Sequence, residues 1–406
     1  MLTQGGTVWA AGINTFGQLG IDSRRYGMMT NFVEVVPGGA KAVAAGASHS
    51  LLLTQDGSVW STGRNVFGQL GDDGLHTGTQ SFVQVIPNDA TAVAAGARHS
   101  LVVMRDGSVW TTGFNLYGQL GDGSTIHRSR FVQVVSGGAD AVAAGSEHSM
   151  VLMQDGSVWT TGLNSRGQLG DGSESYYFKS SFVQVVSNGT KAIAAGGYHS
   201  IVLKQDNSVW TTGENSYGQL GYGTTTSRSN FVQVVASGAQ AIAAGHDHSM
   251  VLKQDGSVWA TGRNNFGQLG DGTRTSSETF VKVISSGVQT VAAGDWDSMV
   301  LTHDCSLWAT GSNVYGQVGD GSTIAKNKFV RVLTSRDGAY GTLRVPIICS
   351  DKRRISSFSY VVYSRKCVFM PSLIPDAHHF SYLCSNFPPT FLPIIVFACM
   401  HDRVVV

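Results

Sequence analysis

Residues 131–173 read FVQVVSGGADAVAAGSEHSMVLMQDGSVWTTGLNSRGQLGDGS, and variants of this stretch recur along most of the chain. The repeated tryptophan occupies positions 9, 60, 110, 159, 210, 259 and 308, so the spacings are 51, 50, 49, 51, 49 and 49 residues. A fixed period of this length indicates a single structural unit that is repeated many times.

Each repeat predicts four short β-strands. In the quoted copy, residues 131–135, 141–144, 148–153 and 157–161 are rich in apolar and β-branched residues, and Gly, Asn and Asp separate them. The Asp-Gly pairs at 56–57, 106–107, 155–156 and 255–256 predict hairpins closed by a type I′ turn. We therefore expect an all-β protein, a β-propeller of about seven four-stranded blades. The small residues of the AAG runs, such as Ala44-Ala45-Gly46, fit the crowded strand nearest the ring axis.

One blade is expected to be split or incomplete. If the strand that starts with phenylalanine is the first of each blade, complete sets of four begin at Phe32, Phe82, Phe131, Phe182, Phe231 and Phe280. Residues 2–11 and 329–333 would then each supply part of a seventh blade. No further AVAAGxxHS phrase follows Leu333, so two strands of that blade are missing from the pattern.

Composition divides the 406-residue chain near residue 336. Residues 1–335 hold 49 of the 51 Gly, whereas residues 336–406 hold four of the five Cys and six of the eight Pro. We predict a propeller domain over 1–335 and a divergent, poorly ordered or irregular Cys- and Pro-rich tail over 336–406. The sparse cysteines favour a reducing compartment, the cytoplasm, with the nucleus as an alternative.

Charge and hydropathy narrow the partners. The formal net charge is +1, which offers no strong attraction to nucleic acid, so we expect no specific nucleic-acid partner. The apolar run at 391–400 is short and contains Pro393, so no membrane partner is predicted. Another protein remains as the expected partner.

The repeated polar residues are interpreted as scaffold, so we predict no catalytic, cofactor-binding or metal-binding residue. The GQLG phrases lack the GxxxxGK[ST] pattern of a phosphate loop and are typical of tight turns with positive φ. The histidines at 49, 99, 148, 199 and 248 recur once per blade, so they are spread around the ring and cannot converge on one Zn²⁺. We expect each imidazole to be buried and bonded to neighbouring backbone, locking one blade to the next. The repeated tryptophans are expected to pack between blades.

The phrase GSVWTTGxNxxGQLGDG, with GxxHS about a dozen residues before the Trp, resembles the repeat of the regulator of chromosome condensation family. The resemblance covers about 335 of the 406 residues. It implies a seven-bladed propeller and two kinds of activity. The founding member accelerates guanine-nucleotide release from the small GTPase Ran and docks on nucleosomes, and other members are binding propellers, some of them in ubiquitin ligases.

We predict a non-catalytic propeller that binds a protein partner. Guanine-nucleotide exchange on a Ran-like GTPase is the first alternative, and the substrate-binding part of a ubiquitin ligase is the second. The resemblance implies that an exchange factor carries an inserted β-hairpin wedge, and the uniform spacing of 49 to 51 residues leaves no room for one.

Positions that differ between blades are the candidates for partner binding. One set directly precedes the repeated His or its counterpart, and its members are Arg98, Glu147, Tyr198, Asp247 and Trp296. A second set lies in the loops before the Phe strands, and its members are Arg25, Tyr26, Arg128, Arg130 and Tyr177. Arg and aromatic residues are favoured at the centres of protein interfaces. If Tyr198 is solvated, Tyr198→Ala should change stability by less than about 0.5 kcal/mol.

Overall fold

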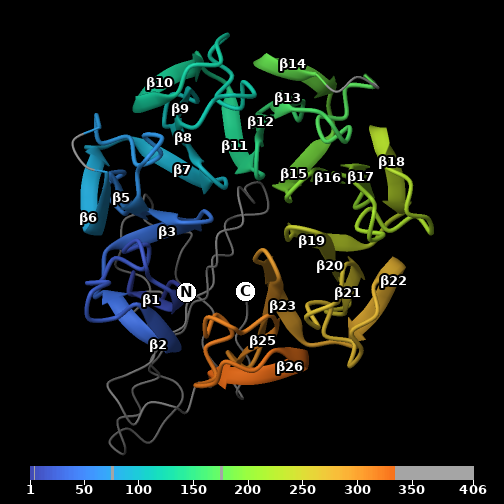
Figure 1. Cartoon of the computed structure of the whole chain (residues 1–406). Helices are drawn as coiled ribbons and strands as arrows, with labels where there is room; N and C mark the ends of the chain where they lie inside the picture. Colours follow the sequence, from blue (N-terminus) through green and yellow to red (C-terminus); the bar gives the residue numbers. More distant parts are fainter. Residues whose placement is uncertain (4, 75–76, 174–176, 334–406) are drawn as a thin grey trace, which may run out of the picture.

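The computed structural model describes residues 1–3, 5–74, 77–173 and 177–333. The regular secondary structure of these residues consists of 26 β-strands. They form six four-stranded antiparallel sheets and one two-stranded sheet, arranged as blades around a ring (Figure 1). The predicted all-β propeller, with six complete blades and an incomplete seventh, is confirmed. The predicted tail at 336–406 lies outside the described residues and stays a prediction.

The first three complete blades follow one another along the chain. Blade 1 contains β3 (Ala40–Ala45), β4 (His49–Thr54), β5 (Val59–Arg64) and β6 (Gly78–Ile86). Blade 2 contains β7 (Ala90–Ala95), β8 (His99–Met104), β9 (Val109–Gly113) and β10 (Arg128–Val135). Blade 3 contains β11 (Ala139–Ala144), β12 (His148–Met153), β13 (Val158–Leu163) and β14 (Phe178–Val186).

The next three blades repeat the same order. Blade 4 contains β15 (Thr190–Ala195), β16 (His199–Lys204), β17 (Val209–Gly213) and β18 (Arg228–Val235). Blade 5 contains β19 (Ala239–Ala244), β20 (His248–Lys253), β21 (Val258–Gly262) and β22 (Ser277–Ile284). Blade 6 contains β23 (Val288–Ala293), β24 (Asp297–Thr302), β25 (Leu307–Gly311) and β26 (Lys326–Leu333).

The phasing of the blades differs from the prediction. The Phe strand is the outermost and last strand of its blade, and the Ala-rich strand is the innermost and first. β26 therefore completes blade 6, and the partial blade 7 pairs β1 (Val8–Ile13) with β2 (Met28–Val36). The Asp-Gly hairpins specify only that the second and third strands are joined, so they leave open which neighbour begins the blade. The Ala-rich runs do surround the axis, as predicted, since Ala45, Ala95 and Ala144 are among the residues that line the central cavity.

The Asp-Gly turns also differ from the prediction. At residues 56–57 only Gly57 has positive φ (84°), and the Gly57 N–H donates to the Thr54 carbonyl while the Thr54 N–H donates to Ser58. This pattern is a three-residue hairpin loop in which a type I turn is followed by a left-handed residue, and not a type I′ turn. Asn207 takes the left-handed position in blade 4, with φ 67°.

A glycine of one blade faces a phenylalanine ring of the next blade at every interface between blades, which we call a seam. The Gly that ends each GQLG or GQVG phrase has positive φ, and a side chain there would collide with the Phe ring of the next blade. These pairs are Gly20–Phe82, Gly71–Phe131, Gly121–Phe182, Gly170–Phe231, Gly221–Phe280, Gly270–Phe329 and Gly319–Phe32. The predicted tight turn with positive φ is confirmed, and its glycine has a second role, which is to admit the neighbouring ring.

The two strands of blade 7 close the ring between blade 6 and blade 1 (Figure 1). On one side Trp9 and Phe32 pack against the blade 6 core that includes Leu307. On the other side Leu2 and Val8 pack with the core of blade 1. In the part of the chain that the structure describes, these residues join the first and last complete blades through apolar contacts.

The repeated histidines are fully buried and join adjacent blades, as predicted, and the Nε2 atom of each contacts a serine side chain of the next blade. His49 Nε2 lies 2.9 Å from Ser100 Oγ on blade 2, and the Ser100 hydroxyl donates back to the Gln69 carbonyl of blade 1 at 2.7 Å. His99, His148, His199 and His248 make the equivalent contacts. The repeated Trp packs between blades as expected, since Trp159 of blade 3 lies against the core of blade 2.

Candidate functional site

One end of the ring carries all of the long loops. In blade 1 the register pairs Ala45 with Ser50, His49 with Gly63, and Gly63 with Thr79. The turn between the first and second strands and the loop between the third and fourth strands therefore leave the blade at the same end. We call this end the loop face. The opposite end, the hairpin face, carries the short hairpins and the links between blades.

All ten predicted partner-binding residues lie on the loop face, in two concentric sets. The inner set occupies the turns that follow the innermost strands, and it contains Arg98, Glu147, Tyr198, Asp247 and Trp296. The outer set lies in the long loops or at the start of the outermost strands, and it contains Arg25, Tyr26, Arg128, Arg130 and Tyr177.

Two members of the inner set, Tyr198 and Trp296, belong to a connected cluster on blades 4 to 6. The Tyr198 and His246 rings meet edge to face with centroids 5.7 Å apart, and His246 lies 6.5 Å from Trp296. Trp296 in turn lies 5.6 Å from Phe266. Tyr198 is half-buried. We name Tyr198, His246, Phe266 and Trp296 the aromatic arc.

The Asp247 carboxylate holds His246, a member of the aromatic arc, through a hydrogen bond and a charge interaction. It is only 5% exposed, and it contacts His246 Nδ1 at 3.0 Å and the Arg263 guanidinium at 3.1 Å. Burial raises the pKa of Asp247, but the hydrogen bond and charge of His246 and the hydrogen bond from Arg263 outweigh it and lower the pKa overall. The hydrogen bond to Asp247 raises the pKa of His246. Asp247 is therefore a carboxylate held in place by His246 and Arg263, and it orients both of these side chains.

Arg98 is part of a second cluster, over blades 1 and 2. Its guanidinium lies 5.5 Å from the centroid of Phe67 and 5.6 Å from that of Phe114, and Phe114 stacks on His127 at 4.8 Å. Burial raises the pKa of the neighbouring Glu147, and the positive charge of Arg98 partly offsets this effect. Such cation–π contacts hold a long side chain in place at the surface.

The outer set makes mostly local contacts. Arg128 pairs with Asp122 at 2.6 Å, Arg130 pairs with Asp73 of the preceding blade, and Arg25 lies 5.2 Å from the Tyr26 ring centroid. Tyr177 is 72% exposed. The structure thus places these residues at the rim without joining them into one cluster.

Sequence reasoning missed several members of the clusters. Phe67, Tyr217 and Phe266 belong to a position two residues before the Gln of each GQLG phrase, and the repetition of that phrase marks it as scaffold. This position carries an aromatic side chain in six of seven repeats, at residues 16, 67, 117, 217, 266 and 315, and Arg166 in the other. That regularity was the available signal. What no repeat pattern shows is that Arg263 of blade 5 contacts Tyr217 of blade 4, with the guanidinium 4.7 Å from the ring centroid.

Large exposed apolar side chains gather on the loop face. Within the described residues, every large hydrophobic that is exposed lies in its loops, turns or first strand residues, and these are Phe16, Tyr26, Met28, Val66, Leu116, Ile126, Tyr177, Phe178, Trp296, Val314, Tyr315 and Ile324. Scattered exposed apolar residues need no explanation, but their confinement to one end of a ring does.

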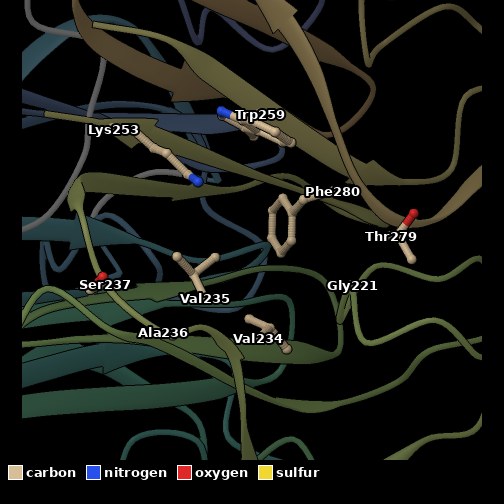
Figure 2. Close-up of a pocket in the computed structure, with 9 residues that line it drawn as sticks. All are labelled: Gly221, Val234, Val235, Ala236, Ser237, Lys253, Trp259, Thr279 and Phe280. Carbon is tan, nitrogen blue, oxygen red and sulfur yellow. The ribbon is translucent and has the colours of Figure 1, made fainter. Parts of the chain in front are cut away.

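A groove of about 440 Å³ lies between blades 4 and 5 (Figure 2). Val234 and Val235 form one wall and Trp259 and Phe280 the other, and Lys253 Nζ lies 4.4 Å from the Trp259 ring centroid. Phe280 is also the ring that packs on Gly221. Because the same Gly–Phe contact occurs at every seam, we attribute this groove to blade packing.

Neither a metal centre nor a membrane span is evident in the part of the chain that the structure describes. No group of three or more His, Cys, Asp or Glu side chains there could hold a metal ion. Among the same residues, no helix has the length and apolar character needed to cross a membrane.

Comparison with known families agrees with this architecture. The model described as RCC1-like domain matches residues 1–237, and the regulator of chromosome condensation (RCC1) repeat matches residues 239–268 and 255–301. The chain belongs to the RCC1-like domain family. The predicted resemblance is confirmed. A search of curated proteins found no sequence match to this RCC1-like chain.

Solved structures share the fold of this RCC1-like propeller. Human WBSCR16 superposes with a TM-score of 0.72 at 22% identity, covering 81% of this chain and 94% of that one. Yeast RCC1 (Prp20), solved bound to Kap60, gives a TM-score of 0.72 at 20% identity, covering 83% and 86%. Prp20p from Saccharomyces cerevisiae, solved in a study of its binding to Gsp1p and histones, gives 0.71 at 20% identity, covering 81% and 86%. At these identities the likeness concerns the fold alone.

Proposed function

We propose that this chain is a non-catalytic propeller that binds a protein partner through its loop face. The observation that supports this most directly is the confinement of the exposed large hydrophobics to that face. Exposed apolar and aromatic groups rimmed by polar loops are typical of protein interaction sites. The aromatic arc and the Arg98 cluster add residue types that dominate binding energies at interfaces.

The fold relatives support a protein partner. Prp20p has binding properties to Gsp1p and histones, and yeast RCC1 (Prp20) has been solved bound to Kap60. A small GTPase is therefore the second candidate partner, and exchange on it the second candidate function. The loops between third and fourth strands span 13 or 14 residues in every complete blade, which leaves none long enough for an inserted hairpin wedge. This uniformity favours binding without exchange. For the role in a ubiquitin ligase, nothing beyond the propeller itself adds support.

Affinity capture with mass spectrometry tests the proposal. The loop-face variant is Leu116→Ser with Trp296→Ser, since these side chains are 53% and 37% exposed. The control is Gln154→Ser with Gln254→Ser, two exposed positions in the hairpins of the opposite face. We expect proteins captured by the wild type and by the control to be lost from the loop-face variant. Equal loss from both variants, or retention by both, would contradict a loop-face site.

A further inference from the structure

The turns that follow the innermost strands of blades 3 to 6 are joined by backbone hydrogen bonds into one continuous strip. The Ser146 N–H donates to the Gly197 carbonyl at 3.2 Å, the Gly197 N–H to the His246 carbonyl at 3.0 Å, and the His246 N–H to the Asp295 carbonyl at 3.1 Å. Four successive blades are thus bridged through backbone. Gly197 permits this approach, because a Cβ there would lie 2.7 Å from the His246 carbonyl oxygen. These hydrogen bonds restrain the backbone of the four turns.

The strip and the ends of the third strands beside it are acidic. On blades 3 to 6 these inner positions carry four carboxylates, Glu147, Glu214, Asp247 and Asp295, and one guanidinium, that of Arg263. Asp247 is held by Arg263 and His246, whereas Asp295 is exposed and Glu147 and Glu214 are half-buried. The equivalent inner positions of blades 1 and 2 carry Arg64 and Arg98, while the outer loops of those blades hold Asp72, Asp73 and Asp122. The inner part of the loop face is therefore acidic over blades 3 to 6, which we call the acidic side, and basic over blades 1 and 2.

Tyr198 lies at the centre of the acidic side. Burial raises the pKa of its phenol, and the negative charges of Glu147 and Glu214, which come from blades 3 and 4, raise it further. On its other side it meets the His246 ring, beyond which lies Trp296. An aromatic ring surrounded by carboxylates attracts a cation through both its π-face and its neighbours' charges.

We propose that the acidic side of the loop face, centred on Tyr198, Glu147 and Glu214, receives an arginine-rich segment of the partner protein. The proposal rests on the proposed function and specifies its partner. A guanidinium suits this place because it stacks on aromatic rings and pairs with carboxylates at the same time. A rigid backbone strip reduces the ordering cost of binding. A nucleic-acid partner is disfavoured, since phosphates would meet carboxylates.

Fluorescence anisotropy with a short labelled peptide of alternating Arg and Ser tests the proposal. The test variant is Glu147→Gln with Glu214→Gln, and the matched control is Glu34→Gln with Glu278→Gln, which removes two carboxylates from the outermost strands. We expect the test variant to bind about tenfold more weakly than the wild type, and the control to be unchanged within about twofold. Tyr198→Leu, which keeps an apolar side chain but removes the aromatic ring, should also weaken binding.

Three results would overturn the proposal. In the first, the wild-type protein binds a peptide of alternating Glu and Ser with the same affinity as the Arg peptide. In the second, the test and control variants are weakened equally, and in the third, the folded variant Glu147→Gln with Glu214→Gln binds the Arg peptide with full affinity. Thermal unfolding of each variant verifies that it is folded. Partner capture separates this inference from the proposed function. Capture that needs Leu116 and Trp296 but not Glu147 and Glu214 would retain the loop-face function and refute the arginine-rich segment, whereas capture that needs neither pair refutes both.

Discussion

His148 Nε2 lies 2.9 Å from Ser200 Oγ on the next blade, and the same hydroxyl donates to the Gln168 carbonyl at 2.7 Å. Since the hydroxyl has only one proton and gives it to the carbonyl, it must accept a hydrogen bond from the imidazole N–H. His148 Nε2 therefore carries a proton. Burial lowers the pKa of His148 from 6.5 to about 4 in the folded protein, so at pH 7 the imidazole is neutral and this proton is the only one on the ring.

Acid should unfold the propeller through these histidines. The pKa of His148 is lower in the fold than in the unfolded chain, so its contribution to stability is complete above pH 6.5 and is lost as the pH falls toward 4. Burial lowers the pKa of His49 and His248 to about 4 as well, and that of His99 and His199 to about 3. We expect the urea midpoint to fall steeply between pH 6.5 and pH 4.

Substitution of one histidine measures its contribution to the pH dependence of stability. In His148→Gln, the slope of the free energy of unfolding against pH should be smaller over this range by about 1.4 kcal/mol per pH unit, the value for one proton. The control is His303→Gln, because His303 is exposed in a hairpin of blade 6. An unchanged slope in His148→Gln, or an equal change in His303→Gln, would show that the buried imidazoles do not control acid unfolding.

The repeat predicted the architecture but not the phasing of the blades. Strand periodicity, small Ala residues and Gly-rich turns are local properties, so the strands, the inner position of Ala44 and Ala45, and the tight GQLG turns were predictable. Which four strands form one sheet depends on the pairing of the Trp strand with the following Phe strand, as between Trp60 and Gln84. That pairing spans a long loop and leaves no local pattern.

Substitution of Gly221 should separate steric contact from backbone strain. Gly221 has φ +83°, and an added Cβ would lie 2.5 Å from the Phe280 ring across the seam (Figure 2). Gly238 has φ +80° with nothing within 4 Å of the added Cβ. We expect Gly238→Ala to cost about 1–2 kcal/mol from the left-handed backbone alone. Gly221→Ala should cost about 1–3 kcal/mol more because of overpacking.

Urea unfolding of both alanine variants measures this difference. Phe280→Leu should reduce the extra cost in Gly221→Ala, since a smaller side chain leaves room for the methyl group. Equal destabilisation at the two glycines, or a double variant no better than the sum of the single variants, would refute the steric role of the Gly–Phe contact.

Two tryptophans should behave in opposite ways. Trp159 is half-buried against the core of blade 2, so Trp159→Ala should destabilise the protein by about 3 kcal/mol, the lower end of the range for truncating a buried aromatic ring. Trp296 is 37% exposed on the loop face, and Trp296→Ala should change stability by less than about 0.5 kcal/mol. Thermal unfolding compares them, and similar losses at both positions would remove the distinction between scaffold and surface.

The candidate site was predictable as a set of positions but not as clusters. Variation between blades identified Arg98, Tyr198 and Trp296, because the scaffold phrases around them are repeated. Contacts such as that of Trp296 with Phe266 join two loops of neighbouring blades, and only the curvature of the ring brings them together. The charge division of the loop face arises in the same way, from residues about one repeat apart.

Nucleotide exchange gives the sharpest test between the two proposed functions. An exchange factor must distort the nucleotide site of its GTPase, and an inserted hairpin wedge is the element that the family resemblance implies for this task. Here each loop between third and fourth strands has 13 or 14 residues, and the short turns that follow the innermost strands are joined by backbone hydrogen bonds on blades 3 to 6. A rigid surface of this kind is suited to recognition.

We therefore expect the purified protein to leave the release of labelled GDP from a panel of small GTPases unchanged, even where it binds one of them. The comparison is release with and without the protein, and with the Leu116→Ser, Trp296→Ser variant as a binding control. Acceleration of about tenfold, equal to lowering the barrier by about 1.4 kcal/mol, would reverse the ranking of the two functions. If the loop-face variant also lost that acceleration, exchange would be assigned to the same surface, because both substitutions lie on the loop face.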